Sequence, residues 1–214
     1  ADTGSDDDTS TLTLASGELL QLVQTVTDAD GDSDTAAINL GTGVFQIEDA
    51  GPDAVVANAT ADTLVLDETR PVGTDEGGDG APSGLAAVTA NFADNFAAVT
   101  NYGSDGPGST TYSLALTGTN VASGLYALDA ADTSAVAVDG DGIGQGAQIV
   151  LNQSGNLITG SAGGTDYFTI SIDPVTGVVT FTQLANLWHA DTGSDDDTST
   201  LTLASGDLLQ LVQT

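Results

Sequence analysis

Four aspartates alternate with other residues in one short acidic stretch of the chain, VTDADGDSDTA at residues 26–36. The four are Asp28, Asp30, Asp32 and Asp34. Carboxylates this close repel one another unless a cation lies among them, and calcium (Ca2+) takes about six to eight oxygen ligands. The stretch therefore predicts a calcium site, with a solvated acidic turn as the alternative. It does not follow the EF-hand pattern, because Gly31 stands fourth instead of sixth and Asn39 stands where a glutamate is required.

A second acidic group follows in the stretch IEDAGPD, whose proline and small residues are typical of a junction between domains. Glu48, Asp49 and Asp53 lie on both sides of this junction, so an ion held there would stiffen one domain against the next. Glu68, at the end of the next apolar run, is predicted to join the same site. Arg70 offers the alternative, because a guanidinium would pair at least as readily with these carboxylates.

Two further acidic segments are either cation sites or solvated turns. DTGSDDDTS occurs at residues 2–10 and again at 191–199, each time before an alternating apolar run. Successive side chains on a strand point to opposite faces, so three consecutive aspartates reach one ion only if they form a turn. DGDGIGQG at residues 139–146 is an acidic, glycine-rich loop, and because it occurs once it does not indicate a tandem calcium β-roll.

Little in the chain indicates catalysis. It has one histidine, His189, and neither cysteine nor lysine. His189 follows the chain's one tryptophan and has no nucleophile signature beside it, so it is predicted to lie in a packed corner at the end of a strand. Pairs of carboxylates occur throughout the chain, and none stands out as a glycosidase pair. The chain is therefore not expected to be an enzyme.

The composition restricts the partners of this protein. Of its 214 residues 31 are acidic, and the formal net charge is −30. Such a surface repels nucleic acid and anionic membranes and attracts cations. No run of 18 apolar residues occurs, so membrane insertion is not expected. Since the chain has no cysteine, bound metal is one of the few other ways to stabilise an extracellular domain.

The elements that must position these carboxylates are predicted to be short β-strands. Apolar and polar residues alternate in runs that turn-forming residues interrupt, as in antiparallel strands with one buried face. Strands are expected at residues 11–26, 34–40, 63–68, 111–118, 124–129, 134–138, 147–152, 156–160, 166–173 and 177–184. DPVTG between the last two predicts a hairpin loop, and a short helix would fit only at residues 85–99. The predicted fold is an all-β, antiparallel β-sandwich.

The last 25 residues of the sequence repeat the first 25 almost completely. Residues 1–25 and 190–214 match at 24 of 25 positions, with Glu18 in the first copy and Asp207 in the second. The repeat unit is therefore 189 residues long, large enough to fold as a domain. We expect residues 1–50 to be the C-terminal strands of one repeat unit, and residues 51–214 to be most of the next unit without its last strands. Residues 26–48 would complete the same unit, stand apart, or pair with another chain through an unpaired edge strand.

Several segments together resemble a known pattern. YFTISIDPVTGVVTFTQ (167–183), followed across the repeat by VTDADGDSDTA and IEDAGPD, resembles the layout of cadherin-like domains, where a hairpin precedes an acidic turn and an acidic linker. Three segments are more closely similar to the tandem repeats of very large, type I-secreted RTX adhesins, which are biofilm-associated surface proteins of bacteria. They are ADTLVLDETRPVGTD (61–75), YGSDGPGSTTYSLALTG (102–118) and VTDADGDSDTAAINLG (26–41).

This resemblance implies extender domains: calcium-stabilised, cadherin-like or immunoglobulin-like β-sandwiches in series that hold an adhesive tip away from the bacterial cell surface. Such a chain would leave the cell unfolded and fold in extracellular calcium, with neighbouring repeats of the same chain as its partners. The acidic turn of the family corresponds to Asp28, Asp30, Asp32 and Asp34, and its linker to Glu48, Asp49 and Asp53. A unit of 189 residues exceeds the roughly 100 residues of an immunoglobulin module. The alternatives are a carbohydrate- or ligand-binding module and a self-associating surface filament subunit.

Overall fold

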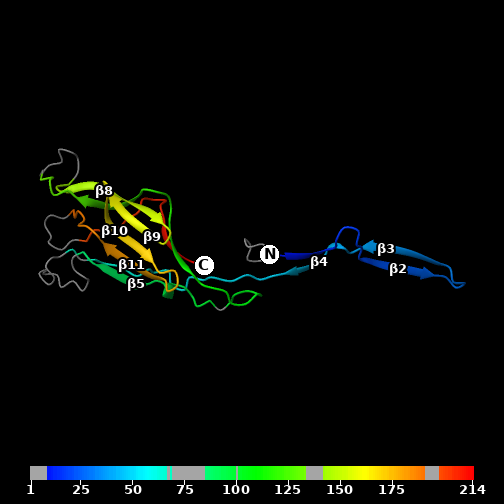
Figure 1. Cartoon of the computed structure of the whole chain (residues 1–214). Helices are drawn as coiled ribbons and strands as arrows, with labels where there is room; N and C mark the ends of the chain where they lie inside the picture. Colours follow the sequence, from blue (N-terminus) through cyan, green and yellow to red (C-terminus); the bar gives the residue numbers. More distant parts are fainter. Residues whose placement is uncertain (1–8, 67, 69–84, 100, 134–141, 191–197) are drawn as a thin grey trace. The chain divides into compact units, whose positions relative to one another are not determined.

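The protein consists of antiparallel β-strands in two units. The computed structural model describes residues 9–66, 68, 85–99, 101–133, 142–190 and 198–214 (Figure 1). Unit 1 comprises Ala1–Asp53 and Val99–Gly108, and unit 2 comprises Ala54–Ala98 and Ser109–Thr214. Within the described ranges no α-helix occurs and no segment forms a helix able to cross a membrane. The predicted all-β, antiparallel class is confirmed.

Unit 2 is built on a six-stranded sheet in which every neighbouring pair is antiparallel. The strands follow the order β5-β11-β10-β9-β8-β7 across the sheet. Their bounds are β5 Ala87–Asn91, β7 Val121–Leu128, β8 Gln145–Ser154, β9 Leu157–Ala162, β10 Thr165–Ile172 and β11 Val178–Gln183. Strand β10 illustrates the sequence pattern, because Phe168 and Ile172 on one face are buried while the intervening Thr169 and Ser171 are only partly buried.

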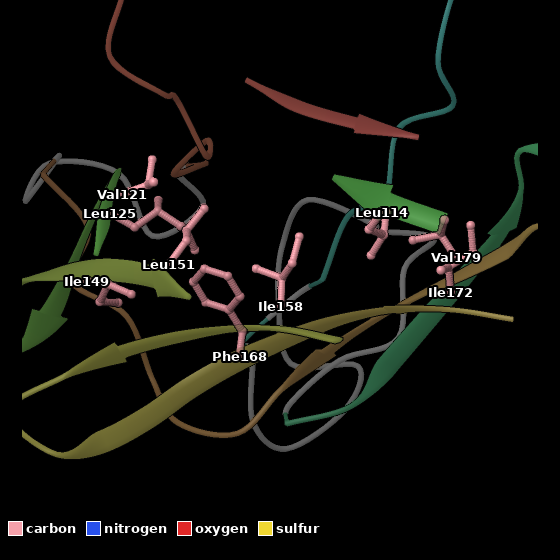
Figure 2. Packing of buried hydrophobic residues seen from close by; sticks show 9 residues of the cluster. All are labelled: Leu114, Val121, Leu125, Ile149, Leu151, Ile158, Phe168, Ile172 and Val179. Carbon is pink, nitrogen blue, oxygen red and sulfur yellow. The ribbon is translucent and has the colours of Figure 1, made fainter. Parts of the chain in front are cut away.

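A two-stranded ladder forms a second layer over this sheet. Strand β6 (Tyr112–Leu116) pairs antiparallel with β12 (Leu209–Gln213), and Leu211 lies opposite Leu114. Figure 2 shows the buried apolar side chains of the core. They are Leu114, Val121, Leu125, Ile149, Leu151, Ile158, Phe168, Ile172 and Val179. Unit 2 is therefore sandwich-like, and the second copy of the repeated text supplies one of its strands.

The predicted DPVTG hairpin joins β10 to β11. The Oδ1 atom of Asp173 accepts hydrogen bonds from the backbone N–H of Val175 at 2.8 Å and of Thr176 at 3.3 Å. Gly177 ends the turn with a φ of +70°, a conformation that strains other residues. The hairpin thus follows from an aspartate that bonds its own turn and a glycine that closes it.

Unit 1 consists of two separate two-stranded ladders. Strand β1 (Thr9–Thr13) pairs antiparallel with β4 (Thr42–Glu48), and β2 (Gln21–Thr27) pairs antiparallel with β3 (Ser33–Asn39). All residues of these four strands are exposed. Their exposed large apolar residues are Leu12, Leu22, Val23, Val26, Ile38, Val44, Phe45 and Ile47. Two-stranded ladders by themselves are only marginally stable in water.

Two predicted elements have a different form in the structure. Residues 85–99 contain β5 and a short 3-10 helix, η1 (Ala93–Asn95), in place of an α-helix. The reason is that Ala90 of β5 has a ladder partner, Val179 of β11, far along the chain. The strand expected at residues 11–26 is divided into β1 and β2, since Gly17 turns the chain with a φ of +93°.

One predicted strand is not formed in the described residues, and another lies outside them. Residues 63–66 lie outside any strand, although Leu64 is partly buried against the core of unit 2. The alternation there therefore accompanies partial burial of Leu64 without a strand. The strand expected at residues 134–138 lies outside the described residues, as do Asp6–Asp8 and Asp195–Asp197 of the repeated acidic segment.

Candidate functional site

The acidic turn between β2 and β3 is held by its own backbone. Asp28 donates its N–H to the carbonyl oxygen of Asp32 at 2.9 Å. The Oδ1 atom of Asp28 accepts the N–H of Gly31 at 3.1 Å and that of Asp32 at 2.9 Å. Gly31 has a φ of +103°, which other residues rarely adopt. These bonds define the positions of the aspartates at the tip of the hairpin.

Three of the predicted ligands come together in this turn. One carboxylate oxygen from each of Asp28, Asp30 and Asp32 lies within 4.8 Å of the others, and all three residues are exposed. A hydrogen bond with the side chain of Asp30, aided by backbone N–H groups of the turn, holds the pKa of Asp28 below its usual value. The three carboxylate oxygens are close enough together to bind one metal ion, which would relieve the repulsion among them.

The fourth predicted ligand of the turn, Asp34, stands beside this group. It lies in β3, and its Oδ1 atom accepts the N–H of Thr35 at 2.8 Å. Together with Asp28 and Asp32 it lines a shallow depression on the hairpin surface. Asp34 thus adds negative charge next to the three-aspartate group, without placing an oxygen within 4.8 Å of all its members.

The predicted junction ligands do not form a comparable group. Among the described residues, Glu48, Asp49 and Asp53 do not bring three carboxylate oxygens within 4.8 Å of one another. Asp49 Oδ1 accepts the N–H of the next residue, Ala50, at 2.8 Å. Asp53 donates its own N–H to the carbonyl oxygen of Asn101 at 3.2 Å. Their role as metal ligands stays a prediction.

The backbone at this junction is tied to another segment of unit 1, residues 101–104. Ser104 donates its N–H to the carbonyl oxygen of Ala50 at 2.9 Å. Gly103 approaches so closely that an added Cβ would lie 1.9 Å from the same oxygen, and its φ is +78°. Only glycine fits this contact, which positions the carbonyl beside Asp49.

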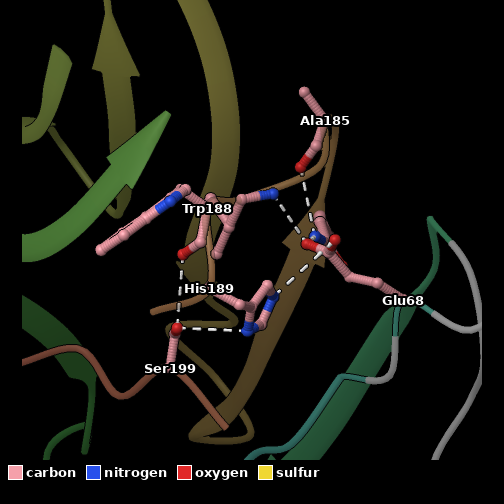
Figure 3. Close-up of polar contacts among 7 residues, drawn as sticks. Glu68, Ala185, Trp188, His189 and Ser199 are labelled. Carbon is pink, nitrogen blue, oxygen red and sulfur yellow. Dashed lines mark hydrogen bonds and ion pairs between the residues drawn. The ribbon is translucent and has the colours of Figure 1, made fainter. Parts of the chain in front are cut away.

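Glu68 lies in a different polar cluster, within unit 2 (Figure 3). Its Oε1 atom accepts hydrogen bonds from the side-chain amide of Gln183 and from the N–H of Leu187, the latter at 2.8 Å. Its Oε2 atom lies 3.9 Å from Nε2 of His189. Burial raises the pKa of Glu68, but the contacts with His189, Leu187 and Gln183 together outweigh burial and lower the pKa below its usual value. Its predicted role as a metal ligand stays a prediction.

His189 links Glu68 to the second copy of the repeated text. Its Nδ1 atom lies 3.2 Å from the Oγ of Ser199 (Figure 3). The neighbouring Trp188 donates its ring N–H to the carbonyl oxygen of Ile143 at 2.8 Å and packs edge-on against Tyr126. This corner is packed, as the sequence predicts. The contact among Glu68, His189 and Ser199 carries no signal in the local sequence, because Glu68 lies more than a hundred residues before its partners.

The fold and the acidic turn define an all-β repeat protein with a candidate cation site. A family match covers residues 63–214, more than half of the chain, and the family is described as a domain of unknown function, DUF5801. The chain belongs to this family. No curated protein and no solved structure matches it. Since the family description assigns no activity, the function must be argued from the acidic turn and the repeat.

Proposed function

We propose that this chain is an extender repeat of a giant bacterial surface adhesin, rigidified by calcium at acidic turns and inter-domain junctions. The observation that carries this proposal is the group of three exposed aspartates at the tip of the β2–β3 hairpin. It occurs in a chain with a net charge of −30, no cysteine, and nearly identical text 189 residues apart. Such units in series would form an acidic rod whose stiffness depends on bound cations.

Calcium is the proposed ion because of the donor chemistry. Asp28, Asp30 and Asp32 offer carboxylate oxygens, the ligands of hard cations, whereas zinc and copper favour imidazole and thiolate. The exposed turn leaves further coordination positions to water and to backbone carbonyls. Calcium tolerates such irregular shells, while magnesium requires nearly ideal octahedral geometry.

The junction residues extend this proposal to neighbouring repeats of the same chain. Glu48 ends β4, the last strand of unit 1 in the described part of the chain, and Asp49 and Asp53 follow it. An ion bound by these carboxylates would stiffen the link to the next repeat, and Glu68 would be a further metal ligand within unit 2. Export by the type I route also fits calcium dependence, because an acidic chain without its ions would stay unfolded until it meets extracellular calcium.

Thermal unfolding of the full chain with excess calcium, and with excess EDTA, tests this function. A site occupied at about 100 times its Kd adds about 2.7 kcal/mol, so chelation should lower the Tm of unit 1 by several degrees. Asp30→Asn should remove most of this difference, while Asp166→Asn, at an exposed aspartate of β10, should preserve it. An unchanged Tm on chelation would contradict the proposal. A shift that Asp30→Asn leaves intact would assign calcium binding to another site.

A further inference from the structure

Strand β2 has one edge in use and one open edge. Within the described part of the chain it pairs with β3 alone. Leu40 donates its N–H to the carbonyl of Leu20 at 2.7 Å, and Asp28 donates its N–H to the carbonyl of Asp32 at 2.9 Å, with no bulge between them. Successive residues of an antiparallel strand direct their N–H and C=O to opposite edges. The even-numbered residues of β2 therefore bond to β3, and the odd-numbered ones face the open edge.

Strand β12, the second copy of the same text, uses the opposite edge. Thr117 donates its N–H to the carbonyl of Leu208 at 2.9 Å, and Thr111 and Thr214 exchange N–H···O bonds of 2.8 and 2.9 Å. Leu208 and Thr214 correspond to residues 19 and 25 of the first copy. These positions are odd-numbered, so the edge that β12 gives to β6 is the one that β2 leaves open.

The segment before β12 also bonds to the rest of unit 2 through the edge that the first copy leaves open. Thr202 donates its N–H to the carbonyl of Ser123 in β7 at 2.8 Å. In the first copy the counterpart of Thr202 is Thr13, and the next residue, Leu14, donates its N–H to the carbonyl of Gly41 at 3.4 Å. Adjacent residues face opposite edges, so β1 can pair with β4 on one side while a β7 strand contacts it on the other. Strand β7 is the outermost strand of the six-stranded sheet.

The apolar side chains of the two copies support the same arrangement as their hydrogen-bonding edges. Leu209 and Leu211 of β12 pack against the core of unit 2. Their counterparts in β2, Leu20 and Leu22, are 40% and 61% exposed. Ile38 of β3 lies opposite Leu22 on the same face and is 59% exposed. The hairpin thus extends the face that β12 buries in unit 2, and this face is uncovered in unit 1.

We propose that residues 9–48 complete the sandwich of the preceding copy of this repeat. The β2 strand pairs with β6 of that copy, as β12 does here, and β1 lies along its β7. Strands β3 and β4 then become the outer strands of the two layers. The β2 strand is then hydrogen-bonded on both edges, to its own β3 on one side and to β6 of the preceding copy on the other. The second of these contacts repeats the pairing that β12 makes with β6 here. This inference rests on the repeat and the hydrogen bonds, and it is independent of calcium binding and of an adhesin role.

Extending the full chain tests this proposal. A second copy of residues 26–53 is added after Thr214, which continues the repeat. Calorimetry should show the Tm of unit 2 rising by at least about 5 °C, because β12 gains a partner on its free edge. The control extension carries Ala36→Pro. Ala36 lies opposite Gln24 at a bonded position, and proline lacks the N–H, so the gain should disappear. No shift, or an equal shift in the control, would overturn the proposal.

A second measurement asks whether the hairpin and β6 compete for one edge. Ser113 and Val212 lie directly opposite each other on β6 and β12. Since the chain has no cysteine, Ser113→Cys together with Val212→Cys places a single disulfide that locks β12 onto β6. The extension should still raise the Tm of the locked chain by the same amount. Loss of the gain on locking would show that the hairpin must displace β6, and the proposal would then be wrong.

Discussion

One seventeen-residue segment occurs twice in this molecule, in two different surroundings and with a single substitution between the copies. Residues 9–25 and 198–214 differ only at Glu18 and Asp207. In unit 1 the first copy forms β1 and most of β2, and its Leu22 is 61% exposed. In unit 2 the second copy contributes β12, and the counterpart of Leu22 packs against the core. The burial of this segment is therefore decided by its neighbours and not by its own residues.

The turn inside the segment, in contrast, is the same in both copies. Gly17 and Gly206 have φ values of +93° and +102°. Each turn is closed by one backbone bond, from Glu18 to Ala15 at 3.0 Å in the first copy and from Asp207 to Ala204 at 3.1 Å in the second. The local sequence thus determines the turn, while strand pairing and burial depend on distant residues.

The largest expected effect lies where the second copy meets β7. Gly124 has a φ of +75°, and an added Cβ would lie 2.8 Å from the carbonyl oxygen of Thr202. Gly124→Ala should destabilise unit 2 by about 2–3 kcal/mol, because backbone strain and a steric contact add. Gly155→Ala is the control, since it has a φ of +59° but open space around it, and it should cost about 1 kcal/mol. Urea unfolding measures both, and equal costs would mean that the segment at Thr202 is not seated on β7.

A smaller effect is expected from one matched pair of leucines. Leu211→Ala removes a side chain that packs against the core of unit 2, and we expect a loss of about 1–2 kcal/mol. Leu22→Ala removes the same side chain at an exposed position, so the loss should stay below about 0.5 kcal/mol. Chemical unfolding of both variants measures the two losses of stability. Equal losses would contradict the difference in burial between the two copies.

The smallest effect concerns pH and the cluster that Ser199 completes. The folded state holds the pKa of Glu68 below its usual value. Glu68 therefore adds stability above the ordinary glutamate pKa of about 4.3, and this stability is lost as pH falls through the lowered pKa. Below about pH 4.3 the Tm of unit 2 should therefore decline with falling pH, and it should decline less in Glu68→Gln. The difference should correspond to about 1 kcal/mol of unfolding free energy or less. Ser10→Ala, at the counterpart of Ser199 on exposed β1, should leave the profile unchanged. Parallel profiles for the wild type and Glu68→Gln would contradict this role.

What the sequence predicts correctly is local. The alternation at residues 166–173 and the DPVTG turn lead directly to β10 and its hairpin, because period and turn residues act within a few positions. The grouping of Asp28, Asp30 and Asp32 follows for the same reason, since a single turn brings them together. Asp34 lies in β3, beside this group, and its role as a fourth ligand stays a prediction.

What the sequence does not predict depends on distant partners. Ala90 lies in a strand because Val179 pairs with it, and no feature of residues 85–99 reveals that neighbour. The contact of Glu68 with His189 likewise cannot be predicted from the local sequence, because only the fold of unit 2 brings the two residues together. The repeated segment is the clearest case, because its two nearly identical copies differ in burial.

The position of Trp188 has a practical consequence for studying this protein. It is the chain's one tryptophan, and its ring is anchored in unit 2 by the Ile143 carbonyl and Tyr126. Intrinsic tryptophan emission therefore reports on unit 2, whereas far-ultraviolet circular dichroism sums the strands of both units. A comparison of the two optical signals during denaturation would separate the unfolding of the units without any added label.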